Sequence, residues 1–156
     1  MSSAHPDFVG VASDTITSDD IRKFLQSNPP DAIKTLNGEL LDIDADKGWA
    51  RFRYRIVPAF CHSQGRICQG GFLTGMVDSA MAHAAIAKGK LATAVPTLEL
   101  KISFFEAVGP GIVFAEGRVM RWGGSVGFLD GDIKDEKGRV IVHATSTIKI
   151  IRPKAT

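Results

Sequence analysis

The sequence has few cysteines, little excess of either charge, and no long uninterrupted apolar run. Its 156 residues include only Cys61 and Cys68 as cysteines, which excludes a disulfide framework and favours a reducing compartment. The formal net charge is +2 and the basic residues form no cluster, so nucleic acid is not an expected partner. The main apolar stretch spans about 17 residues, at the lower limit for crossing a bilayer, and an aspartate interrupts it. Residues 1–12 lack the features of a signal peptide, so we expect a cytoplasmic protein without a membrane partner.

What the sequence does contain is typical of one folded domain. Hydrophobic residues make up 44% of the chain and charged residues 23%, which is ordinary for a protein with a packed core. A short helix is expected, with Ser18 as its N-cap and two acidic residues in its first turn, and it is expected to stop at Asn28-Pro29-Pro30. We therefore divide the chain into an N-terminal lead-in with a short helix, residues 1–35, and a main domain, residues 36–156.

Six segments of the main domain are expected to be strands joined mostly by tight turns. Residues 49–57 alternate apolar residues with arginines, which indicates one buried and one exposed face. Residues 97–105 alternate in the same way, with Leu98, Leu100, Ile102 and Phe104 on the apolar side. Short turns between successive strands require antiparallel pairing. The expected strands cover residues 39–44, 49–57, 97–105, 112–121, 126–134 and 139–151, and a loop is expected at residues 58–68.

Residues 70–87 are the most informative part of the chain. They are small and apolar nearly all the way round, which predicts a helix covered by protein on most sides. One such helix against one antiparallel sheet is an α+β arrangement, with the sheet wrapped around the helix. Asp78 is the only charged residue between Arg66 and Lys88, and a carboxylate in such surroundings needs a partner or a chemical role.

The run that begins at Gln69 and includes Asp78 resembles the signature of hotdog-fold acyl-CoA thioesterases. The most similar branch is the phenylacetate-degradation (PaaI-type) one, which is related to the 4-hydroxybenzoyl-CoA thioesterases. That family has His-Gly-Gly, a short apolar run, and an acidic residue seven positions after the second glycine, as Asp78 follows Gly71. A later Thr or Ser opens an alternating strand, as Thr97 does here. The resemblance covers roughly residues 36–151 and implies the hotdog fold, an antiparallel sheet wrapped around one long central helix.

The resemblance implies a reaction and a role for each matching residue. Thioester hydrolysis needs a group that activates water or attacks the carbonyl, together with donors for the developing oxyanion. Asp78 is the candidate general base or nucleophile, and the backbone N–H groups of Gly70 and Gly71, which are expected to be free, are the candidate oxyanion donors. Gln69 stands where the family has its histidine and can assist by donating a hydrogen bond, although it does not titrate near neutral pH. Thr97 would orient water or Asp78.

The resemblance also implies two places where substrate binds. Ser63 stands six residues before Gln69, where the family often has an asparagine that positions substrate or water; His62 and Gln64 are neighbouring candidates. For the CoA moiety the family often uses a Gly-Lys/Arg-Ser/Thr stretch, and this chain has a related one in which the basic residue precedes the glycines. The candidates for CoA contact are Arg121, Gly123, Gly124 and Ser125, with Arg152 as a further candidate for phosphate.

The spacing of Gly70 and Asp78 predicts a dimer. Eight helical residues separate them, about 12 Å of axial rise, so one carbonyl cannot touch both groups of one chain. If two helices run antiparallel across a two-fold axis, each Asp78 comes near the other subunit's Gly70, and the resemblance implies such composite sites. We expect a homodimer with shared active sites and an acyl-CoA substrate, commonly doubled to a homotetramer in this family.

Other interpretations remain open from the sequence. Asp78 could be a buried structural carboxylate, and a hotdog protein could bind an acyl thioester without cleaving it. A hydratase or dehydratase ranks last because we find no histidine in the sequence context that those enzymes use. His83 lies about 500° around the helix from Asp78, so a core or interface histidine is expected. Cys61, His62 and Cys68 lack a clear fourth ligand, so no metal is expected, and no cofactor beyond the CoA part of the substrate.

Overall fold

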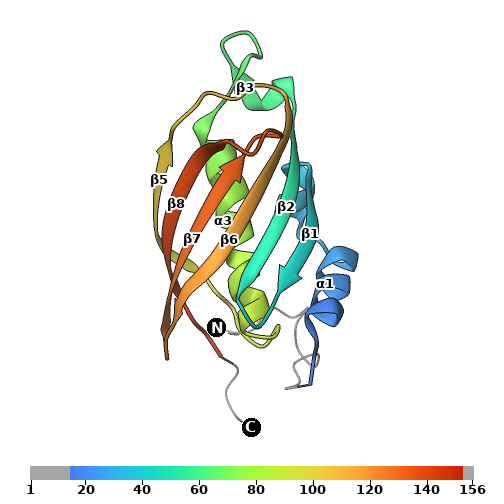
Figure 1. Ribbon diagram of the computed structural model, residues 1–156, viewed down its shortest axis with the longest axis vertical. Helices are drawn as coiled ribbons and strands as arrows, with labels where there is room; N and C mark the ends of the chain where they lie inside the picture. The colour runs from blue at the N-terminus through green and yellow to red at the C-terminus, as the bar shows by residue number, and fades with distance from the viewer. Residues whose placement is uncertain (1–14, 153–156) are drawn as a thin grey trace.

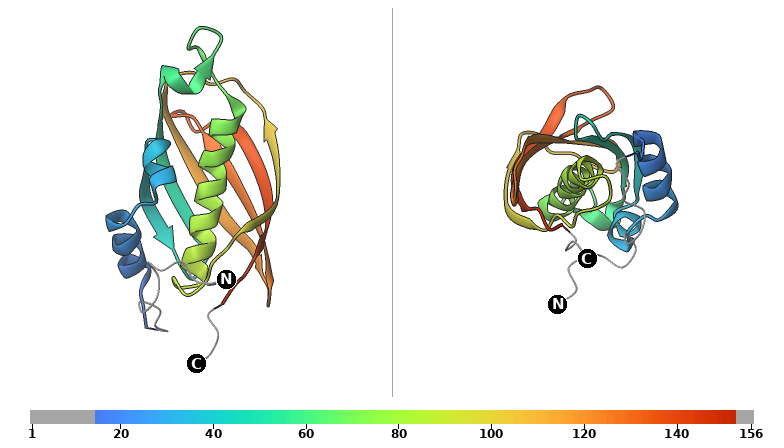
Figure 2. Two further views of the ribbon diagram at one scale, coloured as in Figure 1. Left: turned by 180° about the vertical axis from the view of Figure 1, so that it is seen from behind. Right: turned by 90° about the horizontal axis from the view of Figure 1, so that it is seen from below.

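The computed structural model describes residues 15–152, in which one antiparallel sheet curves around one long helix (Figure 1). The view from below in Figure 2 shows this helix, α3 (Gly70–Lys88), inside the curve of the sheet. The strand order is β1-β2-β6-β7-β8-β5, and every neighbouring pair is antiparallel. This architecture confirms the expected α+β hotdog fold. The strands are β1 (Gly38–Asp44), β2 (Trp49–Ile56), β5 (Thr97–Phe104), β6 (Gly111–Trp122), β7 (Val126–Lys134) and β8 (Val140–Lys149).

The prediction of a plain loop at residues 58–68 is wrong. This segment contains the 3-10 turn η2 (Pro58–Phe60) and a small hairpin made of β3 (Cys61–His62) and β4 (Ile67–Cys68). The Gln69 amide donates to the Phe60 carbonyl at 2.8 Å, and the Cys68 amide donates to the Val108 carbonyl at 2.7 Å. The hairpin and its two anchors therefore lead the chain directly into α3.

The N-terminal helix α1 (Ser18–Ser27) is confirmed, but its cap lies one residue earlier than predicted. Thr17 is the N-cap and forms a capping box with Asp20. The Ser18 hydroxyl instead accepts the Ala45 amide at 2.9 Å, which ties α1 to the end of β1. A second helix, α2 (Asp31–Thr35), follows and was not predicted. The first 14 residues of the lead-in, 1–14, lie outside the described residues.

The helix α3 is buried along most of its length because its small side chains let the sheet approach closely. Gly117 in β6 gives the closest approach: a Cβ atom at this position would lie 2.4 Å from backbone atoms of Ala80 and Met81. Gly117 therefore determines how near the sheet lies to the helical turn that follows Asp78.

Among residues 15–152, no helix is both long and apolar enough to cross a membrane.

Replacing Gly117 with alanine is expected to destabilise the protein by at least about 2 kcal/mol, because the new methyl group meets helix backbone that cannot move alone. Gly124→Ala is the matched control, since a Cβ there meets nothing within 4 Å. Urea unfolding of the two variants measures the difference. Equal unfolding free energies would contradict the close packing of β6 on α3.

Strand β5 forms one edge of the sheet and is exposed along much of its length. Its sheet neighbour is β8, on one side only. Leu98 and Phe104 expose 58% and 48% of their surface, and Phe105, just past the strand, exposes 60%. An edge strand that carries large exposed apolar side chains is a template for pairing with another chain. This edge is therefore the part of the sheet best suited to contact a second subunit.

Candidate active site

Asp78 lies in the middle of α3 and is half-buried. Its Oδ1 accepts a hydrogen bond from the Thr97 hydroxyl at 3.0 Å, which confirms that the two predicted residues lie together. Burial raises the pKa of the Asp78 carboxyl above its ordinary value, and the hydrogen bond from Thr97 opposes part of that rise. A carboxylate with a raised pKa and one oriented oxygen is suited to accept a proton.

A β-bulge points Thr97 toward Asp78. In the pairing of β5 with β8, Thr97 lies opposite Ile148 and Glu99 lies opposite Thr147, so Leu98 is the extra residue. The sequence prediction placed Leu98 on the apolar face, and this is wrong, since 58% of its surface is exposed. With regular alternation, Thr97 would point to the face opposite Leu100; the bulge reverses this and brings its hydroxyl to Asp78.

At the N-terminus of α3, the two predicted oxyanion donors differ. The Gly71 amide donates to Oε1 of its neighbour Gln69 at 2.7 Å, so the prediction that this amide is free is wrong. The Gly70 amide has no acceptor among the described residues, 15–152, and it lies at the positive end of the helix dipole. Gln69 is the N-cap of α3, a role that the sequence did not reveal. Because its oxygen is used, the Nε2 group is the part of Gln69 that remains to donate to a ligand.

Phe104 covers the approach to Gly70. A Cβ atom at Gly70 would lie 2.9 Å from Cζ of Phe104, so the ring stands directly over the first turn of α3. A cavity of about 330 Å³ opens here, lined largely by apolar residues that include Cys68, Leu73 and Phe105. This role of Phe104 is not predicted by the sequence, where its only signal is an aromatic pair at the end of an alternating strand. The cavity gives an apolar group room beside a free backbone donor.

Gly70 and Asp78 lie at well-separated positions along α3 of one chain. Eight residues of continuous helix separate them, about 12 Å along the axis. Strand β5 runs past both positions, with Thr97 at Asp78 and Phe104 at Gly70. Within one chain, Asp78 and the candidate oxyanion donor Gly70 are therefore too far apart to contact the same carbonyl group.

The other predicted substrate-binding residues lie at the two ends of the molecule. Ser63 is in the turn of the β3–β4 hairpin with φ 54°, where its hydroxyl contacts His62 Nδ1 at 2.8 Å and its carbonyl accepts from Arg66 Nε at 3.0 Å. This hairpin stands beyond the N-terminus of α3, at the top of Figure 1. Ser63 is thus on the Gly70 side of the fold.

The candidate CoA-binding residues follow the end of β6 at the opposite end. The Ser125 carbonyl accepts from the Ile150 amide at 2.8 Å, and the neighbouring Lys149 amide donates to the Pro96 carbonyl at 2.9 Å. The turn is therefore close to the start of β5 and to Thr97, rather than to Gly70. Arg152 Nη2 donates to the Gly123 carbonyl at 3.4 Å, and its Nη1 donates to the Gly124 carbonyl. The basic candidates Arg121 and Arg152 and the residues Gly123, Gly124 and Ser125 thus lie in one turn region.

The chain matches the family model of the thioesterase superfamily over residues 66–142, which include α3, β5, β6 and β7. A phenylacetic acid degradation-related protein from Ralstonia eutropha superimposes with a TM-score of 0.75 and 26% identity, covering 83% of this chain and 98% of that one. The PaaI protein of the phenylacetic acid degradation operon of E. coli gives a TM-score of 0.76 at 18% identity, covering 90% and 99%. A thioesterase from Haemophilus influenzae gives 0.75 at 16% identity, covering 93% and 97%. No curated protein matches the chain.

These similarities agree with the order of elements around α3 and with the residues gathered there. The family match includes Gln69, Gly70, Asp78 and Thr97, and the shared fold covers nearly all of the described chain. The chain belongs to the thioesterase superfamily, as a hotdog-fold protein of the PaaI type.

Proposed function

We propose that the protein is an acyl-CoA thioesterase, which hydrolyses a thioester to a free acid and CoA. The observation that carries the proposal is the half-buried Asp78 carboxylate, whose pKa is raised by burial and which the Thr97 hydroxyl orients at 3.0 Å. Membership of the thioesterase superfamily supports hydrolysis of a thioester. The acyl-CoA substrate is our extension of that support.

In the proposed reaction, Asp78 acts as general base or as nucleophile. As a base, it takes a proton from a water molecule whose oxygen attacks the thioester carbonyl carbon. The negative charge that develops on the carbonyl oxygen is stabilised by the Gly70 N–H. The C–S bond then breaks and the thiolate leaves. Asp78 gives the proton that it took from water to this thiolate. As a nucleophile, Asp78 would attack the carbonyl carbon itself and expel the thiolate, which leaves a mixed anhydride. Water would then hydrolyse this anhydride to the free acid and restore the Asp78 carboxyl group.

We infer that each working site combines Asp78 of one protomer with Gly70 of another. Their separation within one helix and the exposed edge at β5 support a homodimer with two shared sites. A further pairing of dimers into a tetramer is part of the same proposal. Gln69 would assist through Nε2, because its Oε1 is held by the Gly71 amide.

For the substrate, we propose that the acyl group enters the cavity beside Gly70 and Phe104, with Ser63 and Gly71 near the reacting end. The CoA moiety would contact the turn that contains Arg121, Gly123, Gly124 and Ser125. Guanidinium groups suit phosphate, and exposed backbone at glycines lets a ligand approach closely. In a composite site, one subunit would supply the cavity and another the turn.

A non-catalytic acyl-thioester binding protein is the alternative, because Gln69 cannot titrate where the family has histidine. Free thiol released from a panel of acyl-CoAs by the native protein distinguishes the two. Turnover supports the thioesterase. Binding of several acyl-CoAs without release of thiol would support the alternative.

Replacing Thr97 with valine is expected to shift the acidic limb of the pH–rate profile to higher pH. The Thr97 hydroxyl holds the pKa of Asp78 down against burial, so its loss raises that pKa and delays formation of the carboxylate. Thr97→Ser retains the hydroxyl and should keep the native profile. The measurement is kcat/KM across the acidic range. An unmoved limb in an active Thr97→Val enzyme would show that Thr97 does not act through Asp78.

A further inference from the structure

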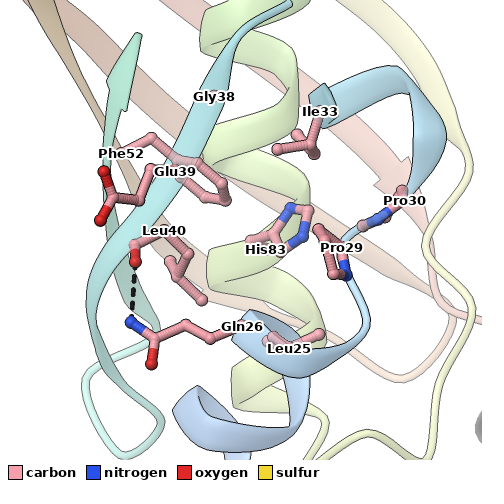
Figure 3. A pocket seen from close by; sticks show the side chains of 10 residues that line it. All are labelled: Leu25, Gln26, Pro29, Pro30, Ile33, Gly38, Glu39, Leu40, Phe52 and His83. Carbon is pink, nitrogen blue, oxygen red and sulfur yellow. Dashed lines mark hydrogen bonds between the residues drawn. The ribbon is translucent and has the colours of Figure 1, made fainter. Parts of the chain in front are cut away.

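A second cavity lies between the N-terminal helices and the sheet, and it shares no lining residue with the candidate active site. Its volume is about 370 Å³, and it is bordered by α1, the α1–α2 connection, α2, β1, β2 and α3 (Figure 3). At about 30 Å³ for each molecule of liquid water, such a space holds on the order of ten waters, so it is of ligand size. Its apolar walls consist of Leu25, Pro29, Pro30, Ile33, Leu40 and Phe52.

His83 from α3 forms the inner wall of this cavity. Only 6% of the residue is exposed, and its ring packs edge-on against Phe52 with 4.8 Å between ring centroids. Nδ1 lies 2.8 Å from the Ser79 carbonyl oxygen. A carbonyl oxygen can only accept, so Nδ1 carries the proton, and in the neutral ring Nε2 is then an acceptor. Burial lowers the pKa of His83, which favours this neutral form.

Nε2 of His83 has no hydrogen-bond partner within residues 15–152. Figure 3 shows the ring pointing from α3 toward the segment that joins α1 and α2. The other polar side chains of the cavity already have partners. Gln26 Nε2 donates to the Leu40 carbonyl at 2.9 Å, and the Glu39 carboxylate, directed away from His83, pairs with Arg53 at 2.5 Å. Nε2 of His83 is therefore an acceptor that lines the cavity without a donor from the described residues.

We propose that this cavity binds a small neutral molecule with an apolar body and one hydroxyl group, whose O–H donates to Nε2 of His83. The apolar walls favour a hydrocarbon body, and the single unpaired acceptor favours one donor. A charged ligand would lose its hydration without gaining a counter-ion, because Glu39 is already paired with Arg53. The proposal is independent of the hydrolase reaction, since none of these residues belongs to that site.

Phenol and toluene are suitable probes because they have nearly the same shape and differ in the hydroxyl group. The full-length protein, labelled with 15N at histidine, would be titrated with each. Phenol is expected to move the Nε2 signal of His83 saturably, while the signals of His62 and His143 stay in place. In His83→Leu, the affinity for phenol relative to toluene is expected to fall about tenfold, as for the loss of one buried hydrogen bond.

A filled cavity provides the matched control. Ile33→Phe places a ring in the wall and leaves His83 intact, so binding of both probes should be lost while the protein still unfolds cooperatively. Three results would overturn the proposal. These are no saturable binding of phenol to the native protein, signal changes at His62 or His143 instead of His83, and an unchanged phenol-to-toluene ratio in His83→Leu.

Discussion

Replacing Asp78 with asparagine is expected to lower kcat/KM for acyl-CoA hydrolysis by about 10³-fold, because an amide cannot take a proton from water. The substitution keeps the size of the side chain and the oxygen that accepts from Thr97, so the site should keep its shape. The control is Asp31→Asn, which makes the same chemical change at a highly exposed carboxylate of α2. Substantial hydrolysis by a folded Asp78→Asn protein would rule out Asp78 as base or nucleophile.

The same substitution is expected to raise the unfolding temperature at neutral pH. The pKa of Asp78 is raised in the folded state, so the folded protein favours the protonated form. The stability that the protonated Asp78 side chain contributes is therefore fully present below the pKa that Asp78 has in the unfolded chain. It is lost as the pH rises through the pKa that Asp78 has in the folded protein. At neutral pH the native carboxylate destabilises the fold, and asparagine removes that effect. Thermal unfolding at several pH values measures it, and a less stable variant at neutral pH would contradict the burial of this charge.

Replacing Gly70 with proline is expected to lower kcat by about 10²-fold through the loss of one N–H group. Gly70 is the first residue of α3, where proline is well tolerated, and Gln69 already has φ −69° and ψ 134°, which suit a residue before proline. Gly70→Ala is the matched control, since it adds a Cβ against Phe104 but keeps the N–H. If alanine and proline reduce the rate equally, crowding by Phe104 and not the lost donor explains the defect.

Mixing the two inactive proteins tests whether sites are shared between subunits. In a dimer of one Asp78→Asn chain and one Gly70→Pro chain, a composite site with both native groups exists once, and the other site has neither. Random exchange of equal amounts makes half of the dimers mixed, so about a quarter of native activity should return. If no activity returns although mass spectrometry demonstrates that subunits have exchanged, Asp78 and Gly70 of the same chain must act together.

Period and composition in the sequence were enough to predict an antiparallel sheet around one buried helix and to single out Asp78. A strand with one buried face alternates visibly, and β2 does so throughout. A lone carboxylate in an apolar helix is conspicuous because burying it is unfavourable, and this indicated Asp78. Both signals come from the chain itself and need no knowledge of what packs against it.

Other features depend on neighbours and leave little trace in the sequence. Helix α2 has five residues, too few for a helical period, so the cavity that it encloses with His83 could not be foreseen. Glutamine is not among the preferred N-cap residues, so the capping role of Gln69 gave no signal. Phe104 was visible only as an aromatic residue, because its position over Gly70 depends on how β5 passes the helix.

The bulge at Leu98 makes the contact between Thr97 and Asp78 a matter of chain length as well as residue type. Deleting Leu98 would keep every residue that the reaction is proposed to use, yet it would restore strict alternation and turn the Thr97 hydroxyl away from Asp78. A relative with a threonine at the aligned position but one residue fewer before Leu100 would therefore lack this hydrogen bond. Counting residues between the threonine and the alternating run is thus a more reliable guide to the contact than the identity of the threonine alone.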